Sequence, residues 1–215
     1  MRKFKYIILF VALFAISLST FLFLESKLRV TYEKNIKSTM NTTTSDYTVF
    51  LGDNITANFD LDKYFQNETL VNQGVTGDTI GNLMERLDNT ISLSPKKIVL
   101  MIGLNDLIND NGLNPSIKEN YNNLVTSIIN RSNETEIVLE SILPVNSERY
   151  CKLNEDIIKL NDYIKSLSKK YNLAYIDLHD NFSSKSKLVD TLCLDGITPN
   201  DEGYKLIRDN LKSYI

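Results

Sequence analysis

The stretch KIVLMIGLND, residues 97–106, decides the fold. Five apolar residues follow Lys97 without interruption, Gly103 ends the run, and the polar pair Asn105 and Asp106 comes soon after it. An almost continuous apolar run of this length is typical of a strand that is buried on both faces. The stretch therefore predicts a strand of a parallel sheet, with a polar site beyond its carboxyl end.

Four further runs of this kind lie before and after it, at residues 47–51, 70–72, 136–142 and 173–178. Between the runs, apolar residues recur every three or four positions, which is typical of amphipathic helices. This alternation of strands and helices predicts a three-layer α/β/α sandwich around a five-stranded parallel sheet.

Three apolar stripes with helical spacing carry most of this prediction. They are Tyr121, Leu124, Val125, Ile128 and Ile129; Leu153, Ile157, Leu160, Ile164 and Leu167; and Tyr204, Ile207, Leu211 and Tyr214. Asn114 and Pro115 suit the N-cap and the first turn of the helix that carries the first stripe. We expect the stripes to be core-facing surfaces without a chemical role.

Composition limits the function. The 215 residues are 42% hydrophobic and 24% charged, with a net charge of −3, which is ordinary for a globular protein. No basic cluster stands out beyond the N-terminus, so nucleic acid is not an expected partner. The chain has one histidine, His179, and two separated cysteines, so we expect neither a metal nor a cofactor.

The N-terminus predicts a membrane anchor. Residues 1–5 form a basic tail, and the uncharged run at 6–24 is 19 residues long, close to the length that spans the ~30 Å hydrocarbon core. Because basic residues stay on the cytoplasmic side, the rest of the chain is expected outside the cell membrane, on a single-pass signal-anchor. The alternative is a signal peptide that is cleaved, with secretion of the domain. Residues 25–46 are expected to be a linker and 47–215 the domain.

Four motifs follow the predicted strands or lie near the C-terminus. They read FLGDNIT at 50–56, VNQG at 71–74, IGLND at 102–106 and LDGITPNDEGY at 194–204. In this order and spacing they resemble the SGNH (GDSL-type) hydrolase family, in particular small acyl-ester hydrolases similar to lysophospholipases and platelet-activating-factor acetylhydrolases. The resemblance implies a flavodoxin-like sheet with strand order 2-1-3-4-5.

The same resemblance implies a role for each matching position. Asn54 stands where active members carry the nucleophilic serine, and Thr198 stands where they carry the catalytic histidine, whereas the aspartate is kept as Asp195. Gly74 and Asn105 match the oxyanion-hole donors. An amide is a poor nucleophile and a hydroxyl is no base at neutral pH, so the chain is expected to be deficient in ester hydrolysis.

Several alternatives stay open at this point. The domain can be a pseudoenzyme that binds an acylated lipid or glycan or acts as a partner protein, or a purely structural surface module. It can also be an active esterase or acyl transferase with a rearranged catalytic set that uses Cys193, His179 or Thr198. Cys151 and Cys193 are both expected near the site, and outside the cytoplasm they either pair as a disulfide or remain two thiols. The sequence indicates no oligomeric state.

Overall fold

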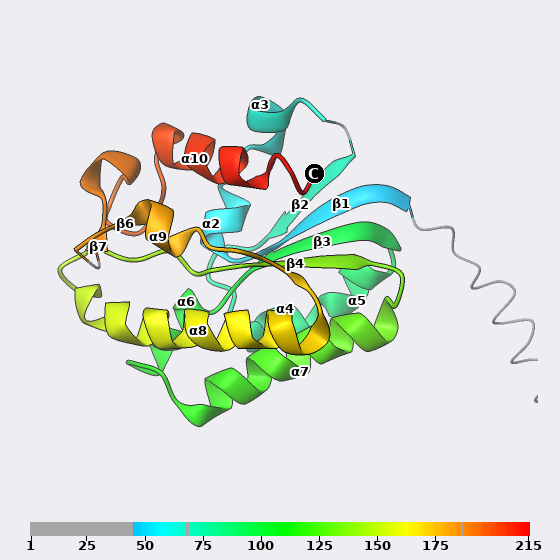
Figure 1. Cartoon of the computed structure of the whole chain (residues 1–215), viewed down its shortest axis with the longest axis horizontal. Coiled ribbons are helices and arrows are strands. Elements are labelled where there is room, and N and C mark those ends of the chain that lie inside the picture. Colours follow the sequence, from blue (N-terminus) through cyan, green and yellow to red (C-terminus); the bar gives the residue numbers. More distant parts are fainter. Residues whose placement is uncertain (1–44, 68, 186) are drawn as a thin grey trace, which may run out of the picture. The chain divides into compact units, whose positions relative to one another are not determined.

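A parallel sheet of five strands forms the centre of the computed structural model, which describes residues 45–67, 69–185 and 187–215 (Figure 1). The strands are β1 (Ser45–Gly52), β2 (Leu70–Gly74), β3 (Pro95–Met101), β4 (Glu136–Glu140) and β5 (Ala174–Ile176). Their order is β2-β1-β3-β4-β5, and every neighbouring pair is parallel. The sandwich and the strand order expected from the sequence are confirmed.

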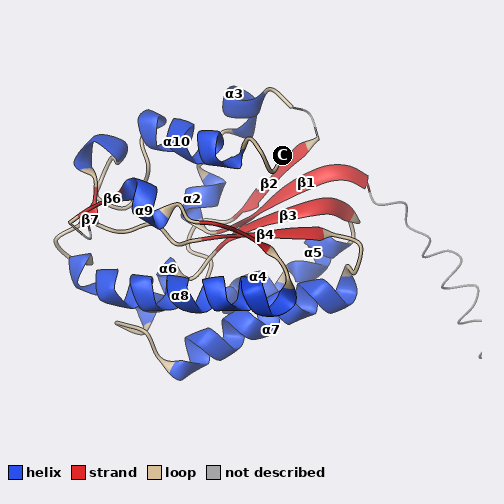
Figure 2. Cartoon of the chain, viewed as in Figure 1, coloured by secondary structure: helices blue, strands red, loops and turns tan. Residues whose placement is uncertain are grey.

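The first layer of helices covers one face of the sheet (Figure 2). It contains α4 (Ile80–Glu85), α5 (Leu87–Ile91), α6 (Leu104–Asn109), α7 (Pro115–Arg131) and α8 (Asn154–Tyr171). Their buried side chains pack with alternate residues of the strands, such as Ile98 and Leu100 of β3. The side chain of Asn114 caps α7 by accepting the N–H of Ile117, and Pro115 stands in its first turn, as predicted.

The second layer covers the opposite face (Figure 2). It contains α2 (Asn54–Ala57), α3 (Leu61–Phe65), α9 (His179–Phe182) and α10 (Asp201–Leu211). Aromatic rings fill much of this core: Phe50 meets Phe59 edge-on at 5.8 Å, and Phe59 stacks on Tyr204 at 5.2 Å. The apolar stripes of α7, α8 and α10 are therefore core, as expected.

Short elements complete the fold. They are the 3₁₀ turns Cys151–Leu153 and Asp190–Leu192 and the small antiparallel pair of β6 (Ser183–Ser184) and β7 (Lys187–Leu188).

Two strands are shorter than their apolar runs indicated. Beyond β4, the backbone N–H and carbonyl of Ile142 bond to the side chain of Asn161 instead of to a strand. Beyond β5, the N–H groups of Leu178 and His179 both donate to the hydroxyl of Ser141, each at 2.8 Å. Side chains thus replace the sheet ladder at these ends, while the flanking residues stay buried.

The predicted basic tail, membrane span and most of the linker lie outside the described residues. Within the part of the chain that the structure does describe, no helix combines the length and the apolar character needed to cross a membrane.

The contact between α2 and the end of β2 requires a glycine. A Cβ atom built on Gly74 would lie 2.2 Å from the backbone nitrogen of Ala57, closer than atoms can approach. A Cβ on Gly52, the partner of Gly74 in the sheet register, would lie 2.2 Å from the carbonyl oxygen of Met101. The two glycines allow α2 to pack directly on the strand ends.

We therefore predict that Gly74→Ala lowers the free energy of unfolding by about 2 kcal/mol or more, because backbone must move to admit the methyl group. Gly81→Ala is the matched control, since its Cβ would meet nothing nearer than 3.6 Å and it lies within α4. This control should be neutral or stabilising by up to about 1 kcal/mol. Denaturant unfolding measures both, and equal effects of the two changes would contradict the steric argument.

Candidate functional site

The candidate site lies at the carboxyl edge of the sheet, where the chain leaves β1, β2 and β3 (Figure 1). Asn54 is the first residue of α2 and is partly exposed. The carboxylate of Asp53, directly before it, caps this short helix by accepting the N–H of Ile55 at 3.0 Å. The cap fixes the turn that presents the Asn54 side chain at the edge of the sheet.

Asn105 meets Asn54 from the start of α6. Its amide nitrogen donates to the carbonyl oxygen of Asp78 at 2.8 Å and lies 3.4 Å from the side-chain oxygen of Asn54. Gly103, with φ of +124°, makes the turn that brings α6 to this position. The structure thus brings together Asn54 and Asn105, two of the positions predicted from the motifs. The side-chain oxygen of Asn54 lies within reach of one N–H of the Asn105 amide.

Gly74 contributes a second predicted donor, its backbone N–H, which donates to the side-chain oxygen of Asn72 at 2.8 Å. The amide nitrogen of Asn72 donates in turn to the carbonyl oxygens of Thr56 at 2.7 Å and Phe59 at 2.9 Å. Asn72 therefore ties β2 to α2, and it uses the N–H that an oxyanion would need.

Asp195 and Thr198 form a compact unit of their own. One carboxylate oxygen of Asp195 accepts the N–H groups of Ile197 at 3.0 Å and Thr198 at 2.7 Å, and the other accepts the Thr198 hydroxyl at 3.1 Å. Burial alone would raise the pKa of Asp195, but these hydrogen bonds outweigh it and hold the pKa below its ordinary value. Asp195 is thus an ionised carboxylate at neutral pH.

Helix α10, which follows this unit in the chain, contacts α2, the helix that begins at Asn54. The hydroxyl of Tyr204 donates to the carbonyl oxygen of Ile55 in α2 at 2.9 Å, and it is buried. Across the described ranges, no hydrogen bond joins Asp195 or Thr198 to the side chain of Asn54. The structure therefore pairs Asn54 with Asn105, and Asp195 with Thr198, as two separate polar groups.

A group of buried charges beneath the site was not predicted from the sequence. The carboxylate of Asp78 pairs with Arg86 at 2.6 Å, and Arg86 also donates to the carbonyl oxygen of Gly52 at 3.2 Å. Asp106 accepts the N–H of Ile80 at 3.0 Å. Residue spacing gave no signal for the Asp78–Arg86 pair, because it joins a loop to the end of a helix eight residues away.

Burial gives these carboxyls unusual acidities. It raises the pKa of Asp53 to about 7, helped by the neighbouring carboxyls of Asp106 and Asp78 and opposed by the N–H of Ile55. It raises the pKa of Asp106 to about 6, opposed by the N–H of Ile80. Elsewhere in the core, burial raises the pKa of Glu140 to about 8.

The other predicted residues lie apart from this group. Cys151 and Cys193 are both half-buried free thiols in the structure, and each approaches a nearby backbone carbonyl at 3.7 Å, of Glu148 and Asp190 respectively. The disulfide considered above is therefore not formed here. Among the described residues, no three His, Cys, Asp or Glu side chains are arranged to hold a metal ion.

The sandwich, with polar residues gathered after β1, β2 and β3, has the same fold as solved structures of a GDSL-like lipase and an acetyl xylan esterase. A sequence profile of the GDSL-like lipase/acylhydrolase family matches residues 50–206. The chain belongs to this family, and the resemblance recognised from its motifs is confirmed.

Solved structures agree with this assignment. One from Streptococcus pneumonia, provisionally assigned as a platelet activating factor, is 25% identical, with a TM-score of 0.71 over 91% of this chain and 98% of its own. A GDSL-like lipase from Bacteroides thetaiotaomicron is 20% identical, with a TM-score of 0.68 over 85% of this chain and 96% of its own. The acetyl xylan esterase AlAXEase is 20% identical, with a TM-score of 0.67 over 79% and 99%. The last two show the fold alone, and no curated protein matches the chain.

The raised acidities predict how stability depends on pH. In the unfolded chain an aspartate ionises near pH 4, so between about pH 4 and 7 folded Asp53 holds a proton that the unfolded chain has released. The protonated Asp53 side chain stabilises the folded domain fully at pH values below the pKa of aspartate in the unfolded chain, and this stabilisation is lost as the pH rises through 7. The Asp53→Asn variant keeps an acceptor for the N–H of Ile55 but cannot ionise. We therefore expect the fall in its free energy of unfolding between about pH 5 and 8 to be smaller by roughly 2 kcal/mol than in the unmodified protein.

Chemical unfolding at several pH values checks this slope. The exposed Asp62→Asn variant is the control and should follow the unmodified protein. A slope that Asp53→Asn leaves unchanged would mean that Asp53 is already ionised at pH 5 in the folded domain.

Proposed function

We propose that this family member is deficient in ester hydrolysis and uses the remains of its catalytic edge to bind an acylated ligand, either a lipid or a glycan. The observation that carries the proposal is the contact between Asn54 and Asn105, at 3.4 Å. At the position that the family resemblance assigns to the nucleophile, an amide oxygen lies where a substrate oxygen would meet the oxyanion donor.

The chemistry of ester cleavage supports this reading. A triad needs a group that attacks and a base with a pKa near neutrality that removes its proton. The Asn54 amide supplies neither, and the Thr198 hydroxyl donates to Asp195 in the place of an imidazole N–H. Asp195 keeps its charge but has no ring to orient.

The same groups are suited to binding. The amide nitrogen of Asn54 and the amide oxygen of Asn105 make no hydrogen bond with the described residues, so they offer a donor and an acceptor to a ligand. An acyl ester offers carbonyl and ether oxygens, which accept hydrogen bonds, and a sugar adds hydroxyls that also donate. The solved relative AlAXEase is described as an acetyl xylan esterase, which favours an acetylated glycan as the first ligand to test.

We also propose that the domain is held outside the cell membrane by an uncleaved N-terminal anchor. The support is the sequence of residues 1–24, with its basic tail and uncharged run. Secretion after cleavage is the alternative. Membrane fractionation with an antibody against the domain distinguishes the two, since a cleaved protein appears in the medium at a lower mass.

Restoring the lost groups tests the catalytic part of the proposal. We expect the full-length protein to hydrolyse a short-chain nitrophenyl ester no faster than Asn54→Ser or Thr198→His alone. The Asn54→Ser/Thr198→His double variant should exceed all three by about 10²-fold or more, because it regains nucleophile and base together. Initial rates at pH 8 measure this.

Adding Asp195→Ala to the double variant is the control, and it should abolish most of the gain. If the unmodified protein is as active as the double variant and loses that activity in Cys193→Ser, His179→Ala or Thr198→Val, the deficiency is refuted. A rearranged catalytic set then replaces it.

The binding part has its own test. We expect acetylated xylo-oligosaccharide to bind the unmodified protein and Asn54→Ala to weaken this binding by about five-fold, the loss of one or two hydrogen bonds. The deacetylated oligosaccharide is the matched ligand control. Unchanged affinity in Asn54→Ala, measured by calorimetry, would place the ligand elsewhere.

A further inference from the structure

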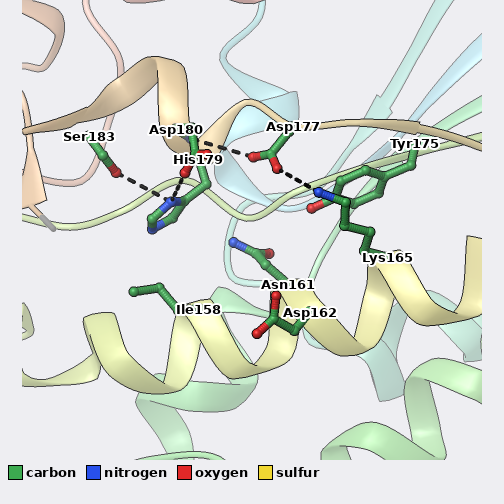
Figure 3. Close-up of a pocket in the computed structure, with 9 residues that line it drawn as sticks. All are labelled: Ile158, Asn161, Asp162, Lys165, Tyr175, Asp177, His179, Asp180 and Ser183. Carbon is green, nitrogen blue, oxygen red and sulfur yellow. Dashed lines mark hydrogen bonds and ion pairs between the residues drawn. The ribbon is translucent and has the colours of Figure 1, made fainter.

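A polar cavity lies beside β5, at the edge of the sheet opposite to β2. Its volume is about 290 Å³, and it opens between α8 and the chain that follows β5 (Figure 3). The residues around it are Ile158, Asn161, Asp162, Lys165, Tyr175, Asp177, His179, Asp180 and Ser183. None belongs to the candidate site, and β5 stands three strand spacings from β1, roughly 14 Å.

His179, the single histidine of the chain, lies at one end of this cavity. Its Nδ1 lies 3.3 Å from a carboxylate oxygen of Asp180 and 3.3 Å from the hydroxyl oxygen of Ser183. Both neighbours meet the same ring nitrogen, so the three residues are not a catalytic triad, in which serine and carboxylate meet opposite nitrogens.

The second ring nitrogen of His179 has no partner. The carboxylate of Asp180 can only accept, so Nδ1 is the ring nitrogen that donates to it, and a neutral ring with its hydrogen on Nδ1 presents a lone pair at Nε2. The residue is only 7% exposed, and Nε2 has no hydrogen-bond partner among the described atoms. Figure 3 shows the ring turned towards α8, with the partly exposed Ile158 opposite it. A buried acceptor in this position calls for a donor from outside the chain.

The charges around the cavity indicate the kind of donor. Lys165 pairs with Asp177 at 3.4 Å and lies over the ring of Tyr175 at 5.4 Å. This pair leaves the carboxylates of Asp162 and Asp180 as the excess charge of the lining, one on α8 and one on α9. A positively charged donor therefore suits the cavity better than a neutral or an acidic one.

We propose that this cavity binds a small hydroxylated primary amine. Its ammonium group donates to Nε2 of His179 and is attracted by the excess negative charge of Asp162 and Asp180, and its hydroxyls meet the polar rim of the cavity. The Ile158 side chain turns aside to admit it. The volume is near the lower end of the ~300–1,000 Å³ range of small-molecule pockets, which favours a ligand the size of one sugar ring.

Glucosamine is the probe that fits these requirements, and glucose is its uncharged match. Because the chain has one histidine, its imidazole nitrogen signals report on the cavity alone when the full-length protein in detergent is titrated by NMR. At constant pH and ionic strength, we expect saturable shifts of these signals with glucosamine and little change with glucose.

Two variants of α8 separate recognition from general charge effects. Asp162→Asn should weaken glucosamine binding by about five-fold, since it removes one exposed carboxylate from the cavity. Glu155→Gln, which removes a carboxylate from the same helix outside the cavity, should leave it unchanged. Both positions are exposed, so neither change should disturb folding.

The proposal is overturned if glucosamine does not move the imidazole signals, if glucose moves them equally, or if the two variants titrate alike. These results are independent of the site around Asn54. Loss of ester chemistry or of acyl binding at that site would leave the response of the His179 signals to glucosamine unaffected.

Discussion

The structure depends on the close packing of α2 against the ends of β1 and β2. The α2 backbone lies where a side chain on Gly74 would be, and the Thr56 side chain and the carbonyl oxygen of Met101 lie where a side chain on Gly52 would be. Once it is there, Asp53 caps the helix, Asn72 binds its carbonyl groups, and the Tyr204 hydroxyl reaches Ile55 from the other end of the chain. A larger residue at either glycine would separate these contacts, so the geometry of the site follows from the absence of two side chains.

The layers could be predicted from the sequence because they follow from burial, whereas the strand order was implied by the family resemblance. The run at 98–102 is apolar at every position because both layers cover this part of the chain, and the stripe of Tyr121, Leu124 and Ile128 repeats at the period of a helix. The short helices α2, α3 and α9 were not predicted, because four or five residues are too few to show a period. Their ends are fixed instead by single side chains, such as the Asp60 cap of α3.

The positions of the site residues could be predicted from the sequence, but their hydrogen-bond partners could not. Motif positions identify Asn54, Gly74, Asn105 and Asp195, but they carry no information on what each hydrogen-bonding group does. The structure shows that Gly74 donates to Asn72 and that Asn105 donates to Asp78 and approaches Asn54. Nor could spacing reveal the ion pair of Asp78 and Arg86 or the unpartnered nitrogen of His179, since both arise from contacts between separate elements.

The direction of β1 has a consequence for how the domain meets its surroundings. All five strands are parallel, so Ser45, the first described residue, lies at the amino edge, and Asn54 follows the carboxyl end of the same strand. The strand that begins at Ser45 and ends just before Asp53 is eight residues long, roughly 25 Å of extended backbone. The chain therefore enters the domain at the back and presents its polar edge at the front. Whatever contacts that edge approaches the domain from the side opposite to Ser45.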